Sequence, residues 1–219
     1  MMFPNEDRFV EHCRSYIGKK FGITASFDDE NSEKIVNHNI IGDILENLMY
    51  PEYKMCIDIV QGPRQQPPDF IAYDDWFIEQ KSFLGSPGFD ISNFASFVKQ
   101  LAEEGGVIRK IFKTKYIIYE YKFLEQENKY EIENFWFLNV WQLPQYGGLR
   151  PISIQSKHGH WYNIRPGSCS GWNDNRKTAQ VFFDKLFECI DTCPNLTNRD
   201  ELKNSINRQI EEARTQGYL

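Results

Sequence analysis

The chain has no long hydrophobic run, no paired cysteine motif and no excess of positive charge. None of its apolar stretches approaches the ~20 residues that a membrane span needs, and residues 1–8 are too polar and acidic for a secretory signal. We therefore expect no membrane partner. The formal net charge is −6, which is not typical of nucleic-acid-binding proteins. It does not exclude DNA binding, because affinity depends on the local field over the binding surface.

Cysteine usage argues against a disulfide scaffold. The five cysteines are odd in number and none belongs to a CxxC pair, which is typical of a reduced, cytoplasmic protein. On paper, Cys189 and Cys193 could form a zinc site with His158 and His160. Cys189 also follows apolar residues at helical spacing, however, and we favour a buried structural thiol.

Several catalytic signatures are absent as well. The chain has no Ser-His-Asp set, no phosphate-cradling glycine loop and no nucleotide-binding fingerprint. Aromatic residues, in contrast, make up 15% of the 219 residues, which argues against disorder. We therefore predict a single globular domain over residues 1–219, large enough for a sizeable core.

The most informative motif is Pro68-Asp69, followed by Glu79-Gln80-Lys81. Residues 69–73 and 76–83 are strand-like and are joined at Asp74-Asp75, a good turn signal. The segment therefore predicts a hairpin with Asp69 at its open end. Because side chains alternate across a strand, Glu79 and Lys81 point to the same face.

This arrangement is typical of a metal-dependent nuclease. Asp69 and Glu79 would supply hard oxygen ligands for Mg²⁺, and Lys81 would place a cation beside the attacked phosphate. The plainer alternative is an ordinary hairpin on which Glu79 and Lys81 form a surface ion pair. A carboxylate and an ammonium within an otherwise aromatic strand favour the nuclease hypothesis, because burying them without partners or a bound ion is costly.

A helix expected over residues 33–49 would add another acid. We expect Asn31 or Ser32 to cap it, and its polar face carries Gly42 and Glu46. Gly42 lowers helix stability, which indicates that another element approaches closely there. If that element is the hairpin, Glu46 lies beside Asp69 and Glu79. The alternative is a solvated polar face, which is commoner on ordinary helices.

The remaining pattern predicts an α/β fold with a central mixed sheet flanked by helices. The other expected helices cover residues 5–20, 90–104 (capped by Asp90), 178–190 and 198–215. The other expected strands cover residues 52–60, 116–121, 135–141, 152–155 and 160–165, and the last two form a hairpin around 157–159.

Glu46, Pro68-Asp69 and Glu79-x-Lys81, followed by a helix and the strand at 116, resemble the PD-(D/E)xK nuclease superfamily. The motif covers about residues 33–121. Gln155-Ser156-Lys157 with the run 161–166 is similar to a stretch in restriction endonucleases, so the chain looks like a type II enzyme. Gln80 departs from the aliphatic residue often found at its position, but it should face away from the metal.

The resemblance implies a Mg²⁺-dependent phosphodiesterase. Asp69 and Glu79 would bind the metal, and Glu46 would act in the outer shell or ligate a second ion. Lys81 would orient or deprotonate the attacking water and offset charge on the scissile phosphate.

Residues 135–190 are the expected DNA-recognition and dimer-supporting part. The candidate DNA contacts, which carry donors suited to base edges, are Gln155, Lys157, His158, Asn163 and Arg165. The alternative is a plain surface hairpin that touches phosphate or water. The leading hypothesis is a homodimer acting on a palindrome in double-stranded DNA. A structure-specific repair or recombination nuclease and a catalytically inactive DNA-binding protein of the same fold are the alternatives.

Overall fold

The computed structural model describes residues 3, 5–22, 24–26, 32–34, 40–63, 67–103 and 107–218. The chain forms two compact units. The N-terminal unit comprises residues 2–86 and 116–137, and the C-terminal unit comprises residues 87–115 and 138–219. Residues 87–115, which lie inside the predicted catalytic range 33–121, therefore pack in the C-terminal unit.

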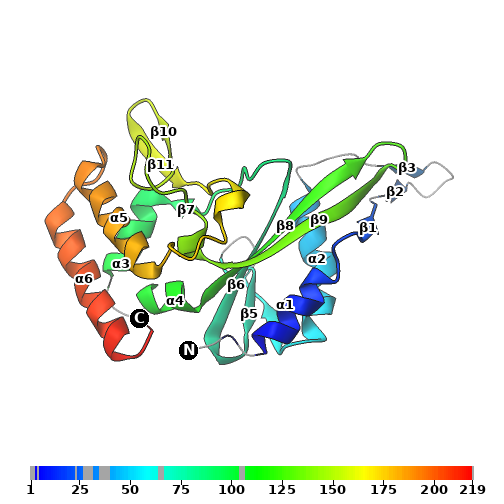
Figure 1. The fold of residues 1–219 in the computed structure, drawn as a ribbon, viewed down its shortest axis with the longest axis horizontal. Helices are drawn as coiled ribbons and strands as arrows, with labels where there is room; N and C mark the ends of the chain where they lie inside the picture. The colour runs from blue at the N-terminus through cyan, green and yellow to red at the C-terminus, as the bar shows by residue number, and fades with distance from the viewer. Residues whose placement is uncertain are drawn as a thin grey trace. The chain divides into compact units, whose positions relative to one another are not determined.

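The N-terminal unit is built on a six-stranded sheet with the order β1-β9-β8-β6-β5-β4 (Figure 1). Its strands are β1 (Lys20–Phe21), β4 (Ile59–Gln61), β5 (Phe70–Ala72), β6 (Trp76–Leu84), β8 (Thr114–Leu124) and β9 (Lys129–Asn139). The pairs β4–β5, β5–β6 and β1–β9 are antiparallel. The predicted hairpin is thus confirmed as β5–β6, joined by a 3₁₀ turn at Tyr73–Asp75. A separate two-stranded ribbon contains β2 (Thr24–Ser26) and β3 (Ser32–Lys34).

Two helices belong to this unit, α1 (Glu6–Arg14) and α2 (Ile41–Lys54). The helix predicted over 33–49 is wrong at both ends. Ser32, one of the two proposed caps, begins strand β3, whereas Asn31 and residues 35–39 lie outside the described residues. α2 runs through Pro51 to Lys54 because Met49 and Tyr53 continue its buried stripe, and their burial outweighs the backbone hydrogen bond that a proline removes.

This extension of α2 also overturns the strand predicted over 52–60, of which only β4 forms. The helix predicted over 5–20 is shorter than expected and ends at Arg14. Asn5 stands at its N-cap position, in the left-handed region with φ 52°, but makes no side-chain capping bond.

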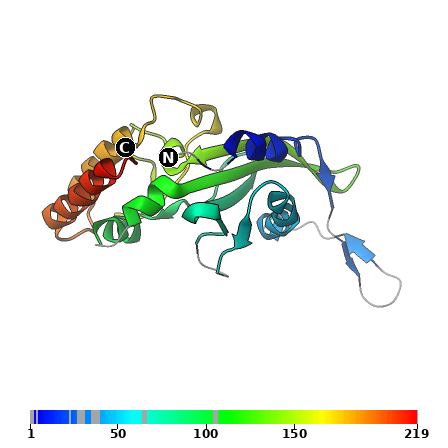
Figure 2. The ribbon, with the colours of Figure 1, turned by 90° about the horizontal axis from the view of Figure 1, so that it is seen from below.

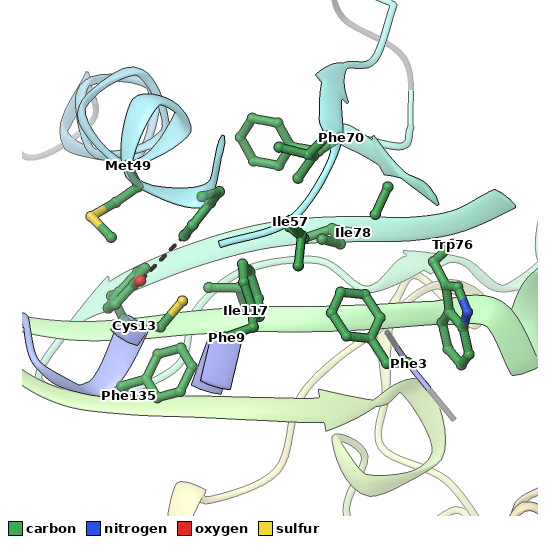
Figure 3. Close-up of a cluster of buried hydrophobic side chains, with 14 of the residues drawn as sticks. Phe3, Phe9, Cys13, Met49, Ile57, Phe70, Trp76, Ile78, Ile117 and Phe135 are labelled. Atoms are coloured by element: carbon green, nitrogen blue, oxygen red, sulfur yellow. Dashed lines mark hydrogen bonds between the residues drawn. The ribbon is translucent and has the colours of Figure 1, made fainter. Parts of the chain in front are cut away.

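A hydrophobic core joins the elements of the N-terminal unit (Figure 3). Phe9 of α1, Met49 of α2, Phe70 of β5, Ile78 of β6 and Ile117 of β8 are all buried in it. Each such side chain stabilises the fold by about 1.5–3 kcal/mol when fully buried. The core therefore fixes α2 against the β5–β6 hairpin.

The described residues of the C-terminal unit form a three-stranded sheet with the order β10-β11-β7 and four helices. The strands are β7 (Ser92–Asn93), β10 (Ile154–Lys157) and β11 (His160–Ile164). The helices are α3 (Phe94–Ala102), α4 (Val107–Lys113), α5 (Ala179–Thr192) and α6 (Arg199–Thr215). Helices α5 and α6 lie side by side (Figure 2). Short 3₁₀ turns occur at Val140–Gln142 and Cys169–Gly171.

One helix start in this unit differs from expectation. Asp90 does not cap α3, which begins at Phe94 and is capped by the Asn93 side chain. Ser92 and Asn93 pair with β11, and the Asp90 carboxylate is bound by Arg165 and Asn163. The chain therefore stays extended until residue 93. The predicted hairpin around 157–159 is confirmed, with positive φ at His158 and Gly159.

The predicted α/β fold with a sheet flanked by helices is confirmed. All five cysteines are free thiols, and Cys189 is fully buried as expected. Within the part of the chain that the structure describes, no helix is both long and apolar enough to cross a bilayer.

Candidate active site

The β5–β6 hairpin brings Asp69, Glu79 and Lys81 together. Asp69 immediately precedes β5, and Glu79 and Lys81 lie on β6. The Lys81 Nζ atom is 3.1 Å from Glu79 Oε2 and 3.4 Å from Asp69 Oδ2. Two carboxylates thus share one ammonium group. Glu79 is only 9% exposed, so this is a part-buried cluster rather than the surface ion pair of the alternative hypothesis.

Backbone groups on both sides hold Asp69 in place. The Gln80 amide donates a hydrogen bond to Asp69 Oδ2 at 2.7 Å, and the Gly62 amide donates to the Asp69 carbonyl oxygen at 2.7 Å. Gly62 approaches so closely that a Cβ atom added there would lie 1.8 Å from the Pro68 carbonyl oxygen. Position 62 therefore requires glycine for steric reasons. The peptide bond between Pro67 and Pro68 is cis.

Burial and charge act in opposite directions on Glu79 and Lys81. Burial raises the pKa of the Glu79 carboxyl, and the Lys81 charge lowers it only in part. Burial would lower the pKa of Lys81, but the charges of Glu79 and Asp69 outweigh it and the pKa is raised. Lys81 therefore stays protonated as long as it faces the two carboxylates without a bound cation.

Helix α2 adds Glu46 to this cluster. The pKa of the Glu46 carboxyl is raised to about 7, first by burial and then by the charge of Asp69, with Lys81 opposing. The close approach inferred from Gly42 is also present, because a Cβ atom there would lie 3.6 Å from Ser82 Oγ on β6. The charges of Asp69, Lys81 and Glu79 thus all act on the Glu46 carboxyl, and its part in a metal site stays a prediction.

This donor set is suited to a hard divalent cation. Within the described residues, no set of three or more His, Cys, Asp and Glu side chains is arranged to hold a metal ion by itself. Mg²⁺, however, typically takes one or two protein carboxylates and completes its oxygen ligands with water and substrate phosphate. Asp69 and Glu79 meet that requirement. Burial is the largest cause of the raised pKa values of Glu79 and Glu46, and a cation bound beside them would favour the ionised form of both carboxyl groups.

Comparison with known proteins identifies the family. The sequence model described as NgoBV restriction endonuclease matches residues 22–212. The chain belongs to the NgoBV restriction endonuclease family. A solved structure titled NlaIV restriction endonuclease is 20% identical, with a TM-score of 0.75 over 92% of this chain and 85% of that one. None of the curated proteins is similar enough to count as a match.

Membership of the NgoBV family confirms the resemblance to type II restriction endonucleases, and the NlaIV enzyme shares the fold. Restriction endonucleases are nucleic-acid hydrolases, so the chain is assigned to that enzyme class. Asp69, Glu79 and Lys81 all lie within the matched range 22–212.

The β10–β11 hairpin, also within the range of the NgoBV family match, carries the predicted DNA contacts. Lys157 and His158 are exposed at its turn. Arg165 instead forms an ion pair with Asp90, with Nε 2.8 Å from Oδ1, and Asn163 Nδ2 donates to Asp90 Oδ2 at 2.8 Å. Arg165 also donates to Gln155 Oε1 at 3.4 Å. Three of the five predicted side chains are thus held by one another and by Asp90.

Several residues at the two sites were not identified from the sequence. Tyr53 falls within the strand predicted over residues 52–60, but it lies on α2 and its hydroxyl donates a hydrogen bond to the Gln80 side chain. Tyr116 on β8 is buried, and burial raises its pKa above the ordinary range, with further contributions from Glu79 and Asp69. Asp90 was interpreted as a helix cap. The only signal for any of these was the polarity of Gln80, whose side chain contacts Tyr53.

Proposed function

We propose that this chain is a Mg²⁺-dependent type II restriction endonuclease that hydrolyses phosphodiester bonds in double-stranded DNA at a specific short sequence. The observation that carries the proposal is the sharing of Lys81 by Asp69 and Glu79. Membership of the NgoBV restriction endonuclease family supports the reaction class.

In this proposal Asp69 and Glu79 hold the metal ion, and Glu46 acts in the outer shell or ligates a second ion. When bound, Mg²⁺ would offset charge on the phosphate and lower the pKa of the attacking water. The Gln80 and Gly62 amides keep Asp69 in position for this role. Without a metal the pKa of the Glu46 carboxyl is about 7, and a cation beside it would favour the ionised form that these roles require.

Lys81 has two roles that depend on its protonation. As an ammonium it donates a hydrogen bond to the phosphate and offsets the charge that develops during attack. If Asp69 and Glu79 bound a metal cation, their negative charges would no longer stabilise the Lys81 ammonium, and the pKa of Lys81 would fall. A neutral Lys81 amine can then accept the proton of the water as its oxygen forms the new bond to phosphorus. The bond from phosphorus to the leaving sugar oxygen breaks in the same displacement.

Sequence readout is proposed for the β10–β11 hairpin. Lys157 and His158 are exposed and suited to phosphate or guanine, whereas Arg165, Asn163 and Gln155 carry groups that match base edges. Because the Asp90 network fixes Arg165 and Asn163, they would meet DNA with little loss of side-chain entropy.

We further propose a homodimer, since two-fold protein symmetry matches a palindromic site most simply. The five free thiols agree with a cytoplasmic location, where such an enzyme would meet foreign DNA. Size-exclusion chromatography with light scattering would test the dimer directly.

Two other functions make different predictions. A repair or recombination nuclease would cut flaps or junctions regardless of sequence, and an inactive DNA-binding protein would show no metal dependence. The part-buried charged cluster favours a catalytic protein. Replacing all of its members with apolar residues would leave no uncompensated charge, so stability alone does not require the cluster.

The deciding experiment incubates phage DNA with the protein and Mg²⁺, beside a Lys81→Ala variant and an EDTA control. We expect discrete fragments that disappear in both controls. A smear would favour the repair nuclease. Absence of cleavage with every divalent metal tested would refute the catalytic assignment and leave the binding protein.

A further inference from the structure

A chain of buried polar side chains lies behind the strand that carries the site. Gln80 is between Glu79 and Lys81 on β6 and is 6% exposed, and Tyr53 of α2 and Tyr119 of β8 are both 0% exposed. Polar groups are rarely buried this deeply unless they form hydrogen bonds with each other. The three residues therefore need a structural or functional explanation.

Hydrogen bonds link the three side chains. The Tyr53 hydroxyl donates to Gln80 Oε1 at 2.5 Å, and the hydroxyl oxygens of Tyr53 and Tyr119 are 3.3 Å apart. Tyr53 is also fixed by aromatic contacts with Phe9 and Phe70, at ring-centroid distances of 5.4 and 5.5 Å. The oxygen of the Gln80 side chain is thus held by a rigid partner.

The backbone of the same residue holds the metal-site carboxylate. The Gln80 amide donates to Asp69 Oδ2 at 2.7 Å. Because neighbouring side chains of a strand point to opposite faces, the side chain of Gln80 is anchored on one side of β6 while Glu79 and Lys81 project to the other. Anchoring this side chain limits rotation of β6 about its own axis, and therefore fixes the direction of the Gln80 amide.

Stability alone does not explain these residues. The Gln80 Nε2 atom is buried and has no hydrogen-bond partner among the residues that the structure describes, which costs free energy. A buried polar pair replaced on both sides by apolar groups of similar shape is often neutral or stabilising. The polar pair is therefore expected to serve something other than the stability of the core.

We propose that Tyr53 and Gln80 are positioning residues, which hold the β6 peptide so that its amide orients Asp69 for the metal. This inference rests on the proposed function, because it concerns the same metal site. Residues that orient metal ligands in this way typically change metal affinity or activity by about 10- to 100-fold when they are replaced.

The test compares Tyr53→Phe, Gln80→Leu and the double variant with the wild-type protein. A matched control is Tyr121→Phe, which removes the hydroxyl of another buried tyrosine in the same unit, on β8. Binding of Mn²⁺ without DNA is measured by titration calorimetry, thermal unfolding is followed by circular dichroism without metal, and DNA cleavage is measured against metal concentration.

We expect each single variant to weaken Mn²⁺ binding by about 10-fold. The double variant should weaken Mn²⁺ binding no more than the larger single effect, because both changes remove the same hydrogen bond. It should also unfold at a higher temperature than either single variant, because Tyr53 and Gln80 lose their polar groups together, and Tyr119, which loses the Tyr53 hydroxyl, keeps its hydrogen bond with Cys13. Tyr121→Phe should leave Mn²⁺ binding unchanged.

The double variant keeps the test decisive even if a single variant folds poorly. If it binds Mn²⁺ within twofold of wild type, the positioning role is refuted, whatever the unfolding temperatures show. If the wild-type protein itself binds no Mn²⁺, the proposed function fails as well. The two failures are thus distinguished by the wild-type titration.

Discussion

The sharpest steric prediction concerns Gly62, which follows β4 and touches the residues that lead into the site. A Cβ atom at position 62 would lie 1.8 Å from the Pro68 carbonyl oxygen and 2.9 Å from its carbonyl carbon. An ordinary contact begins at 3.4 Å, so Gly62→Ala must displace the Pro68–Asp69 peptide by about 1.6 Å. Both neighbours are backbone atoms, so no side-chain rotation relieves the clash.

The displacement has a large expected cost in activity and a smaller one in stability. A 1 Å error in the position of a reacting group costs about 100-fold in rate, so we expect Gly62→Ala to lower the single-turnover cleavage rate by at least that factor. Overpacking destabilises by about 1–3 kcal/mol, which for a chain of this length lowers the unfolding temperature by about 2–12 °C.

Gly42→Ala is the matched control for Gly62→Ala. Its Cβ atom would lie 3.6 Å from Ser82 Oγ, an ordinary contact, and a glycine-to-alanine change at a position that accepts alanine stabilises a protein by about 0.4–1 kcal/mol. We expect near wild-type cleavage and a slightly raised unfolding temperature. The steric argument would be refuted if Gly62→Ala cleaved within threefold of wild type.

The remaining predictions concern charge. The pKa of Glu46 is about 7 in the folded protein, whereas the ordinary value for a glutamate is 4.5. Ionisation of Glu46 therefore opposes folding above pH 4.5, and the effect is complete above pH 7. After discounting for solvent screening, its cost in the free energy of unfolding is about 1 kcal/mol. Thermal unfolding in EDTA should therefore show Glu46→Gln more stable than wild type at pH 8 and nearly equal at pH 4.5, and an equal gain at both values would contradict this. Lys157→Ala should lower the slope of log affinity against log salt by about one phosphate contact on any DNA sequence, as measured by fluorescence anisotropy; an unchanged slope would remove Lys157 from the interface. Asp90→Ala removes the carboxylate that holds Arg165 and Asn163, so we expect additional cleavage sites on phage DNA, whereas an unaltered fragment pattern would speak against readout by these two side chains.

The β5–β6 hairpin was predictable because its determinants are local. Strand propensity, the turn at Asp74-Asp75 and the two-residue alternation that puts Glu79 and Lys81 on one face all lie within a short segment. The approach of α2 to β6 was predicted from Gly42 as an interior helix residue; the contact is present, but Gly42 lies in the first turn of α2, so the premise of that prediction was wrong. The β10–β11 hairpin followed for similar local reasons.

What the sequence did not predict depends on tertiary contacts. Pro51 indicates the end of a helix, yet burial of Tyr53 carries α2 past it, and with Tyr53 placed in a strand its bond to Gln80 could not be inferred. Asp90 has the sequence context of a helix cap, but Arg165 and Asn163, distant in the chain, compete for its carboxylate. In both cases a long-range partner outweighs a local preference.

The division of the chain into two units has a consequence for protein engineering. The N-terminal unit is discontinuous, since it ends at Ser86 and resumes at Tyr116, and the chain leaves it again after Phe137. A single truncation therefore cannot release this unit intact, because β8 and β9 would be lost from the middle of its sheet. Exchanging the C-terminal unit between members of the family would require three junctions, at 86/87, 115/116 and 137/138. A chimera that tests the proposed recognition role of the C-terminal unit therefore has to replace an insertion and a tail together.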